Sequence, residues 1–191
     1  MPIPEAKRKY TYADYLTWPE GDRWEIIDGV PYMQVAPIWQ HQSVSRELLR
    51  QFSNYLLHKP CQVFASPFDL RLSNLDTKDE DTTEVYQPDL TIICDKDKLS
   101  KTGFCGVPEM VIEILSPSTA KTDKLLKFNA YESFGVKEYW IVEPDTKLVN
   151  AFILQGDGRY GRIEVYTEDD EVKVSIFPDF AIDLKLVFEG V

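Results

Sequence analysis

The sequence is poor in the side chains from which most metal centres are built. Its two histidines, His41 and His58, exclude a site made of several histidines. The three cysteines, Cys61, Cys94 and Cys105, are scattered and odd in number, so the sequence predicts neither a disulfide framework nor a zinc site. We expect three buried, reduced thiols.

Membrane and targeting signals are also missing. No apolar run approaches the ~18 residues of a membrane span, and no apolar stretch follows the charges of residues 1–9 to form a signal peptide. We therefore expect a cytoplasmic protein with no membrane contact. The chain also lacks a glycine-rich phosphate loop, a G-x-S-x-G elbow and a basic aromatic signature of RNA binding.

Basic residues are fewer than acidic ones: the sequence has 21 Lys and Arg and 32 Asp and Glu, which gives a formal net charge of -11. A protein that follows a nucleic-acid backbone gains affinity from basic surface, and this average charge would repel one. The acids concentrate in 76–84 and 164–171, which we interpret as solvated loops and turns. The rest of the chain is closer to neutral, but the sequence shows no local basic face.

Apolar sequence is plentiful enough for one folded domain. Of 191 residues, 43% are hydrophobic and 13% aromatic, which is ample for a packed core. No repeat, low-complexity tract or linker divides the chain. We predict a single domain over 1–191, with a core at about 10–154 and a strand-rich C-terminal extension at about 155–191.

Hydrophobic periodicity predicts a mixture of strands and helices. Two strands flank the Asp28-Gly29 turn as a hairpin, and apolar residues recur at helical spacing from Trp39 to Leu57. Further helices are predicted at 10–18 and 119–134, and strands at 62–65, 68–72, 89–94, 110–115, 138–143, 148–154, 163–166 and 172–176. The fold class is therefore α/β, a mixed β-sheet flanked by helices with additional C-terminal strands.

Two of the predicted strands carry an acid in an apolar context. Asp89 follows Gln87-Pro88, and Glu113 lies within the run 110–115. We expect these runs to be neighbouring strands, covered on both faces. Ionised carboxylates held close together in a core need a cation, a shared proton or an opening to solvent. With histidine ligands scarce, a metal here would have oxygen ligands, which favours Mg²⁺ or Mn²⁺ and phosphate chemistry.

A lysine occupies the apolar side of the helix predicted at 119–134. A rotation of about 100° per residue places Lys127 near the middle of the arc that faces the core. Such a lysine must snorkel, pair with a carboxylate or sit in a functional cleft. Asp123 lies one turn earlier, so a surface ion pair with Lys127 is the alternative.

Three other polar residues have open assignments. Glu25 lies on the first hairpin strand, and alternation places Asp69 on the same face as Arg71. Each is either an ordinary exposed strand residue or an auxiliary residue of a shared cleft. His41 opens the long helix, and because no partner motif specifies its chemistry, the interpretation as a surface residue is favoured over a place at a cleft mouth.

The order of these parts resembles the PD-(D/E)xK nuclease superfamily, with Pro88-Asp89 as the PD element and Glu113 as the second acid. Five segments give the resemblance its detail: 24–29, 87–90, 113–118, 123–131 and 138–140. They are similar to the bacterial Uma-type family of restriction-endonuclease-like proteins, first catalogued as a domain of unknown function. The resemblance runs from about Tyr10 to Leu154 and implies a restriction-endonuclease-like core.

The position of the lysine departs from the superfamily pattern. The superfamily's lysine normally stands two residues after the second acid, where this chain has Leu115. In several branches, including the group that this chain resembles, the lysine comes from the following helix. Lys127 occupies the matching place, and Lys124 on the same arc is the second candidate.

The resemblance implies a metal-dependent endonuclease that hydrolyses phosphodiester bonds in DNA. Asp89 and Glu113 would hold Mg²⁺ or Mn²⁺, and the backbone carbonyl of Ile114 would complete the site. The metal would polarise the scissile phosphate and lower the pKa of a bound water, while Lys127 positions that water and offsets charge in the transition state. Glu25, Asp69 and Lys124 are the auxiliary candidates.

Two other functions stay open at this point. One is a catalytically silent oligomeric binding or assembly protein on a nuclease fold, which the charge of -11 favours. The other is a metal-dependent hydrolase of a small phosphorylated substrate, which an acidic surface hinders less than it hinders a polymer. A homodimer or another homo-oligomer is expected, because nucleases that cut two strands often pair their sites. The sequence specifies neither the target, nor DNA over RNA, nor a role in defence, repair or mobility.

Overall fold

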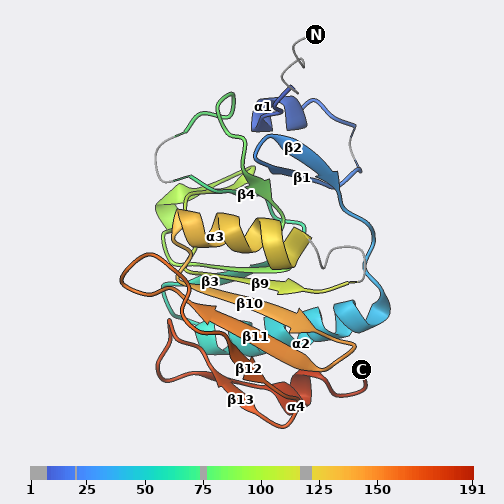
Figure 1. Cartoon of the computed structure of the whole chain (residues 1–191), viewed down its shortest axis with the longest axis vertical. Coiled ribbons are helices and arrows are strands. Elements are labelled where there is room, and N and C mark those ends of the chain that lie inside the picture. The colour runs from blue at the N-terminus through green and yellow to red at the C-terminus, as the bar shows by residue number, and fades with distance from the viewer. Residues whose placement is uncertain (1–7, 20, 74–76, 117–121) are drawn as a thin grey trace, which may run out of the picture.

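The computed structural model describes residues 8–19, 21–73, 77–116 and 122–191, arranged as two six-stranded β-sheets, a separate two-stranded sheet and helices that pack against them (Figure 1). The α-helices are α1 (Tyr12–Tyr15), α2 (Trp39–Leu56), α3 (Phe128–Phe134) and α4 (Leu184–Val187). A 3-10 turn, η1, spans Lys96–Lys98, and a π-helical segment, η2 (Thr122–Lys127), leads directly into α3.

The central sheet has six strands in the order β12-β11-β10-β9-β6-β3. Their bounds are β3 (Gln62–Ala65), β6 (Leu90–Ile93), β9 (Met110–Ile114), β10 (Glu138–Glu143), β11 (Leu148–Ile153) and β12 (Glu164–Tyr166). Strands β9 and β10 run parallel, and the other neighbours run antiparallel. The sheet is therefore mixed, and the helix that ends with α3 forms the crossover between its two parallel strands.

A second six-stranded sheet has the order β2-β1-β5-β4-β8-β7. Its strands are β1 (Trp24–Ile27), β2 (Val30–Met33), β4 (Leu70–Arg71), β5 (Val85–Tyr86), β7 (Leu99–Ser100) and β8 (Gly103–Cys105). The predicted hairpin is confirmed, because Asp28 and Gly29 both have positive φ, 49° and 74°, as a two-residue type I′ turn requires. Strands β13 (Glu171–Lys173) and β14 (Ala181–Asp183) form a separate pair.

Helix α2 covers one face of the central sheet. Its buried residues Val44, Leu48, Phe52 and Leu56 recur at the spacing of one helical turn and pack in the same core as Trp140 of β10. That core also includes residues of β13, β14 and α4: Val172, Ile182, Leu184 and Val187. The C-terminal strands thus pack on the same core as α2.

Helix α3 and the second sheet cover the opposite face. Tyr131 of α3 packs with Val111 of β9 and Tyr139 of β10, and the second sheet contributes Tyr86 and Phe104 to the same core. The two apolar strands β6 and β9 are therefore covered on both faces, as predicted. Gly135, with φ 90°, adopts the left-handed conformation that ends α3.

Short elements are where the predictions depart from the structure. The strand predicted at 68–72 has only two residues in the structure. Strands β5, β7 and β8 were not predicted, because two or three residues are too few to display a period. The helix predicted at 119–134 is described from Thr122, and its first three residues lie outside the described part. Within the described ranges, no helix combines the length and the hydropathy needed to cross a membrane.

The prediction of three reduced cysteines is wrong for two of them. Cys61 and Cys94 form a disulfide, with their Cα atoms 3.9 Å apart. The antiparallel register of β3 and β6 pairs Gln62 with Ile93, so the residues just outside that pair face each other. The sequence separation of 33 between the cysteines hid this proximity. Cys105 is a half-buried free thiol.

Candidate active site

Asp89 and Glu113 face each other across two neighbouring strands. Strand β6 pairs with β9 in an antiparallel register that sets Leu90 against Ile112, so Asp89, just before β6, lies opposite Glu113. The backbone N–H of Ile114 donates a 2.7 Å hydrogen bond to Oδ2 of Asp89 and fixes that carboxylate at the strand end. The expectation that the two acidic runs are adjacent strands is confirmed.

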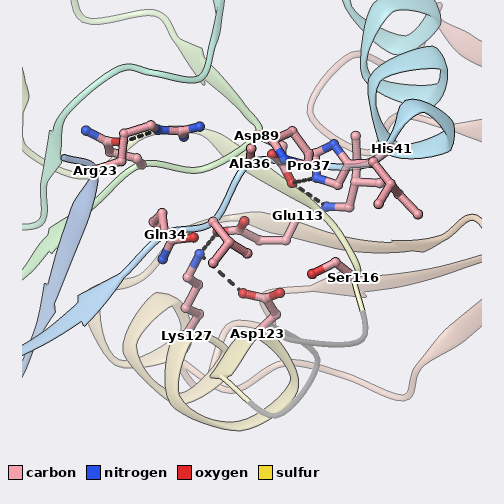
Figure 2. A pocket seen from close by; sticks show the side chains of 14 residues that line it. Arg23, Gln34, Ala36, Pro37, His41, Asp89, Glu113, Ser116, Asp123 and Lys127 are labelled. Atoms are coloured by element: carbon pink, nitrogen blue, oxygen red, sulfur yellow. Dashed lines mark hydrogen bonds and ion pairs between the residues drawn. The ribbon is translucent and has the colours of Figure 1, made fainter. Parts of the chain in front are cut away.

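A pocket of about 240 Å³ opens over these acids (Figure 2). One wall is the segment 34–38 together with His41 of α2, and another is formed by Asp123 and Lys127 of η2. Arg23 and Gln87 line it from the side of the second sheet. The pocket therefore lies where the two sheets and both long helical segments meet, with the two acids opening into it.

Lys127 is buried beneath the pocket and contacts three carboxylates. Its Nζ lies 2.9 Å from Oε1 of Glu25, 2.9 Å from Oε1 of Glu113 and 3.2 Å from Oδ1 of Asp123. The lysine is only 3% exposed. The Asp123–Lys127 pair suggested by the helical spacing therefore exists, but it is buried rather than on the surface, because η2 turns this face into the core.

Glu25 joins this cluster from β1, although the sequence left its assignment open. It is fully buried, and its Oε1 accepts a 2.8 Å hydrogen bond from the backbone N–H of Gln87 while Oε2 accepts a 2.7 Å bond from Nε2 of Gln34. The Tyr131 hydroxyl donates a 2.7 Å hydrogen bond to Oε1 of Glu113. Each buried carboxylate oxygen of Glu25 thus has a donor, as burial of a charge requires.

The charges of the cluster do not balance. Burial raises the pKa of Glu113 well above its usual range, and the charges of Asp123, Glu25 and Asp89 raise it further against the opposing effect of Lys127. Burial lowers the pKa of Lys127, but Glu113, Glu25 and Asp123 outweigh it and the pKa ends well above its ordinary value. A single ammonium serves three carboxylates, so it does not offset the effect of burial on Glu113, whereas the three carboxylates together raise the pKa of Lys127. The lysine stays charged, while the site retains an excess of negative charge that a proton or a metal cation would relieve.

His41 is a site residue that the sequence did not identify. Its Nε2 lies 3.1 Å from Oδ2 of Asp89, and the residue is 8% exposed, so the interpretation as a surface residue is wrong. Its other ring nitrogen, Nδ1, is buried and has no hydrogen-bond partner among the described residues. The path of the segment 34–38 brings the first turn of α2 to Asp89, and nothing in the local pattern of residues encodes that path.

The remaining candidates lie away from the two acids. Asp69 stands just before β4 and accepts hydrogen bonds of 2.8 Å from the Tyr12 hydroxyl and 2.8 Å from Nε2 of Gln87. It therefore touches the site only through Gln87. Lys124 points outward and pairs with Glu143 at 2.7 Å, outside the pocket. Of the two lysines on the predicted arc, only Lys127 reaches the acid pair.

The geometry of the donor atoms tests whether a metal fits. The contacts described for Asp89 fall on Oδ2 and those for Glu113 on Oε1, which leaves one oxygen of each carboxylate for a cation. In the described part of the chain, no three Asp, Glu, His or Cys side chains converge on a common ion position. Two carboxylates do not make a closed zinc or calcium site, but they fit Mg²⁺, which keeps several waters and uses one or two carboxylates together with substrate phosphates.

Comparisons with known proteins find similar sequences. Residues 12–185 match the model of the Uma2 family, whose description is "Putative restriction endonuclease". The chain is 27% identical over 179 residues to the uncharacterized protein slr1290 of Synechocystis sp. (strain ATCC 27184 / PCC 6803 / Kazusa), covering 92% of this chain and 90% of that protein. The uncharacterized protein sll1609 of the same strain is 24% identical over 180 residues, covering 92% and 98%.

A solved structure shares the fold. A putative nuclease belonging to DUF820 from Anabaena variabilis ATCC 29413 superposes with a TM-score of 0.75 at 20% identity, covering 94% of this chain and 97% of that one. At this identity the likeness establishes the fold alone. The predicted α/β class, with a mixed sheet flanked by helices, is confirmed.

Proposed function

Since the chain belongs to the Uma2 family of putative restriction endonucleases, we propose that it is a metal-dependent endonuclease that hydrolyses phosphodiester bonds in DNA. One observation carries the proposal. Asp89 and Glu113 face each other across β6 and β9, each with one oxygen anchored and one unengaged in the described contacts, beside a lysine that stays charged. This is a set of groups that binds a cation and a phosphate together.

Mg²⁺ or Mn²⁺ held by Asp89 and Glu113 would supply the positive charge that polarises the scissile phosphate and lowers the pKa of a water molecule. We propose the backbone carbonyl of Ile114 as a third ligand. In an antiparallel pair, the N–H and C=O of one residue face the same neighbouring strand. The N–H of Ile114 already bonds to Asp89, so its carbonyl faces that side as well.

The side chains around the acids have distinct tasks in this proposal. Lys127 anchors Oε1 of Glu113, and its persistent charge offsets the negative charge that grows on the phosphate in the transition state. His41 and the N–H of Ile114 hold Oδ2 of Asp89, so that the other oxygen turns to the pocket. Glu25 restrains the lysine from the opposite side.

The net charge of -11 favours a second candidate function. A surface that repels a long polyanion hinders a small phosphorylated substrate less, and a pocket of about 240 Å³ suits a small molecule better than a duplex. Hydrolysis of a model phosphodiester without cleavage of any DNA would favour this candidate. A catalytically silent assembly protein would bind no metal at the acids, and light scattering would show its oligomeric state.

The test is a cleavage assay on purified protein with linear, circular and single-stranded DNA and with RNA, across Mg²⁺ and Mn²⁺. We expect the wild type to cleave DNA and Asp89→Asn and Glu113→Gln to abolish this cleavage. Asp169→Asn changes an exposed acid outside the pocket and should leave the cleavage intact. Titration calorimetry should show saturable Mn²⁺ binding that the first two variants lose and the third keeps. Cleavage that survives Asp89→Asn would refute the proposal, and so would a wild-type protein that binds no metal.

A further inference from the structure

Arg23 lines the pocket from the segment that precedes β1, and its side chain is half-buried. Its Nε donates a 3.1 Å hydrogen bond to Oε1 of Gln87, and its Nη2 donates to Oγ of Ser66. Figure 2 shows Arg23 on the side of the pocket away from Ser116 and His41. Both of its hydrogen-bond partners are neutral, so they orient the guanidinium without cancelling its charge.

This lack of neutralisation sets Arg23 apart in a chain rich in acids. Within the described ranges, no carboxylate lies within 4.0 Å of the Arg23 guanidinium. The pocket's other cation, Lys127, is enclosed by three carboxylates. Elsewhere, Arg71 pairs with Asp79 at 2.6 Å and Arg159 with Glu132 at 2.7 Å. Arg23 is thus the pocket cation whose charge is left for an external anion.

Two links fix Arg23 relative to the acid pair. The backbone N–H of Ser66 donates a 3.1 Å hydrogen bond to the carbonyl of Asp89, and Gln87 precedes Asp89 by two residues. The Gln87 amide is oriented from its other end, where Nε2 donates to Oδ1 of Asp69 at 2.8 Å. Its oxygen is therefore turned towards Arg23. Asp69, which lies outside the pocket, thus helps to orient Arg23 through this amide.

We propose that Arg23 is an anion-binding subsite that holds a second phosphate of a nucleotide chain, next to the phosphate hydrolysed at Asp89 and Glu113. The inference rests on the proposed function. The two described hydrogen bonds use two of the five N–H donors of the guanidinium, so the planar group keeps donors for phosphate oxygens. Because the acids repel a polyanion, the protein needs a cationic side chain to hold the flanking phosphate. The geometry assigns that task to Arg23.

The first experiment measures binding without cleavage. In a Glu113→Gln background with EDTA, the affinity for a short fluorescein-labelled single-stranded DNA is followed by anisotropy at several salt concentrations. We expect Arg23→Gln to weaken binding about tenfold or more, and to reduce the slope of log K against log salt by about 0.7, the value for one phosphate contact to a single strand. Arg162→Gln, which removes the same charge from an exposed position outside the pocket, should leave affinity and slope unchanged.

A second variant guards against misfolding. Arg23→Lys keeps the charge but loses the planar fork, so it should bind more weakly than the parent at an unchanged salt slope. In the wild-type background with Mg²⁺, Arg23→Gln should raise KM with a smaller effect on kcat, because it removes a contact to substrate away from the reacting bond.

The outcomes separate the inference from the proposed function. Equal affinity and slope in Arg23→Gln and Arg162→Gln would overturn the subsite, as would a parent protein that does not bind the oligonucleotide. Binding that depends on Arg23 in a protein whose wild type cleaves nothing would refute the hydrolysis and leave the subsite standing. Cleavage by the wild type with a KM that is unchanged in Arg23→Gln would support the hydrolysis and refute the subsite.

Discussion

Replacing Lys127 with methionine should destabilise the protein strongly, because it removes the ammonium that Glu25, Glu113 and Asp123 share. Removing one partner of a buried ion pair typically costs about 3–5 kcal/mol. Three partners would make the loss larger, but relief of the burial of Lys127 and protonation of a carboxyl oppose it. We therefore expect a loss of about 3–5 kcal/mol at pH 8, a large part of the total stability of a single domain.

The loss should be smaller at pH 5, and the sign follows from the pKa of Glu113. That pKa is raised in the folded protein above its ordinary 4.5, so the folded protein holds a proton that the unfolded chain has released. Stability therefore falls as pH rises from 4.5 through the folded pKa. Without Lys127 the carboxyls bind protons more tightly, and the fall with pH becomes steeper. Lys127 adds no slope of its own, because its raised pKa keeps it charged in both states below pH 10.5.

Urea denaturation of the metal-free protein at pH 5 and pH 8 measures both effects. Lys124→Met is the matched control, since Lys124 lies on the same helical segment but its ion pair with Glu143 is exposed and should contribute at most about 1 kcal/mol. A loss in Lys127→Met of less than about 1 kcal/mol at pH 8 would refute the argument. So would a loss that is equal at the two pH values.

Three further predictions address other parts of the structure. Glu113→Gln should raise the free energy of unfolding of the metal-free protein at pH 8 by about 1 kcal/mol, because the fold disfavours the ionised acid. A lower free energy of unfolding for this variant, measured by urea denaturation, would contradict the prediction. His41→Ala should weaken Mn²⁺ binding about 10- to 100-fold in calorimetry, because it removes one of the two groups that hold Oδ2 of Asp89. Restored affinity in His41→Gln would support a positioning role, and unchanged affinity in His41→Ala would exclude it. Replacing Cys61 and Cys94 together with serine should lower stability by about 3–4 kcal/mol, because their disulfide closes a loop with a sequence separation of 33, and reduction with dithiothreitol should have no further effect on that variant.

The fold could be predicted as far as its elements are long. The 18 residues of α2 display five turns of amphipathic pattern, and the runs that form β6 and β9 are apolar enough to predict a sheet covered on both faces. Beyond its β1–β2 hairpin, the second sheet could not be predicted, because its other strands have two or three residues and most are held by partners distant in the sequence. Pairing between distant strands also brought Cys61 against Cys94.

The site residues also fall into those that the sequence could identify and those that it could not. Asp89, Glu113 and Lys127 were identifiable because each is a charged residue in an apolar pattern, which burial makes costly and therefore informative. His41 and Arg23 give no such signal. The first is polar at the start of a helix and the second is polar in a loop, and both are ordinary in those places. Only the path of the segments 21–23 and 34–38 turns them towards the acids.

The positions of the charges explain how so acidic a protein could bind a phosphate substrate. Many of the described acids that contribute to the formal charge of -11 are exposed, where water screens them. Inside the pocket, the excess lies on Asp89 and on the carboxylates around Lys127, and a divalent cation would offset it there. Arg23 lines the same pocket as the acids, and no described carboxylate forms an ion pair with it. Attraction of a phosphate therefore depends on the loaded metal and on Arg23 together, so substrate should bind weakly to the metal-free protein and more tightly as Mg²⁺ is added.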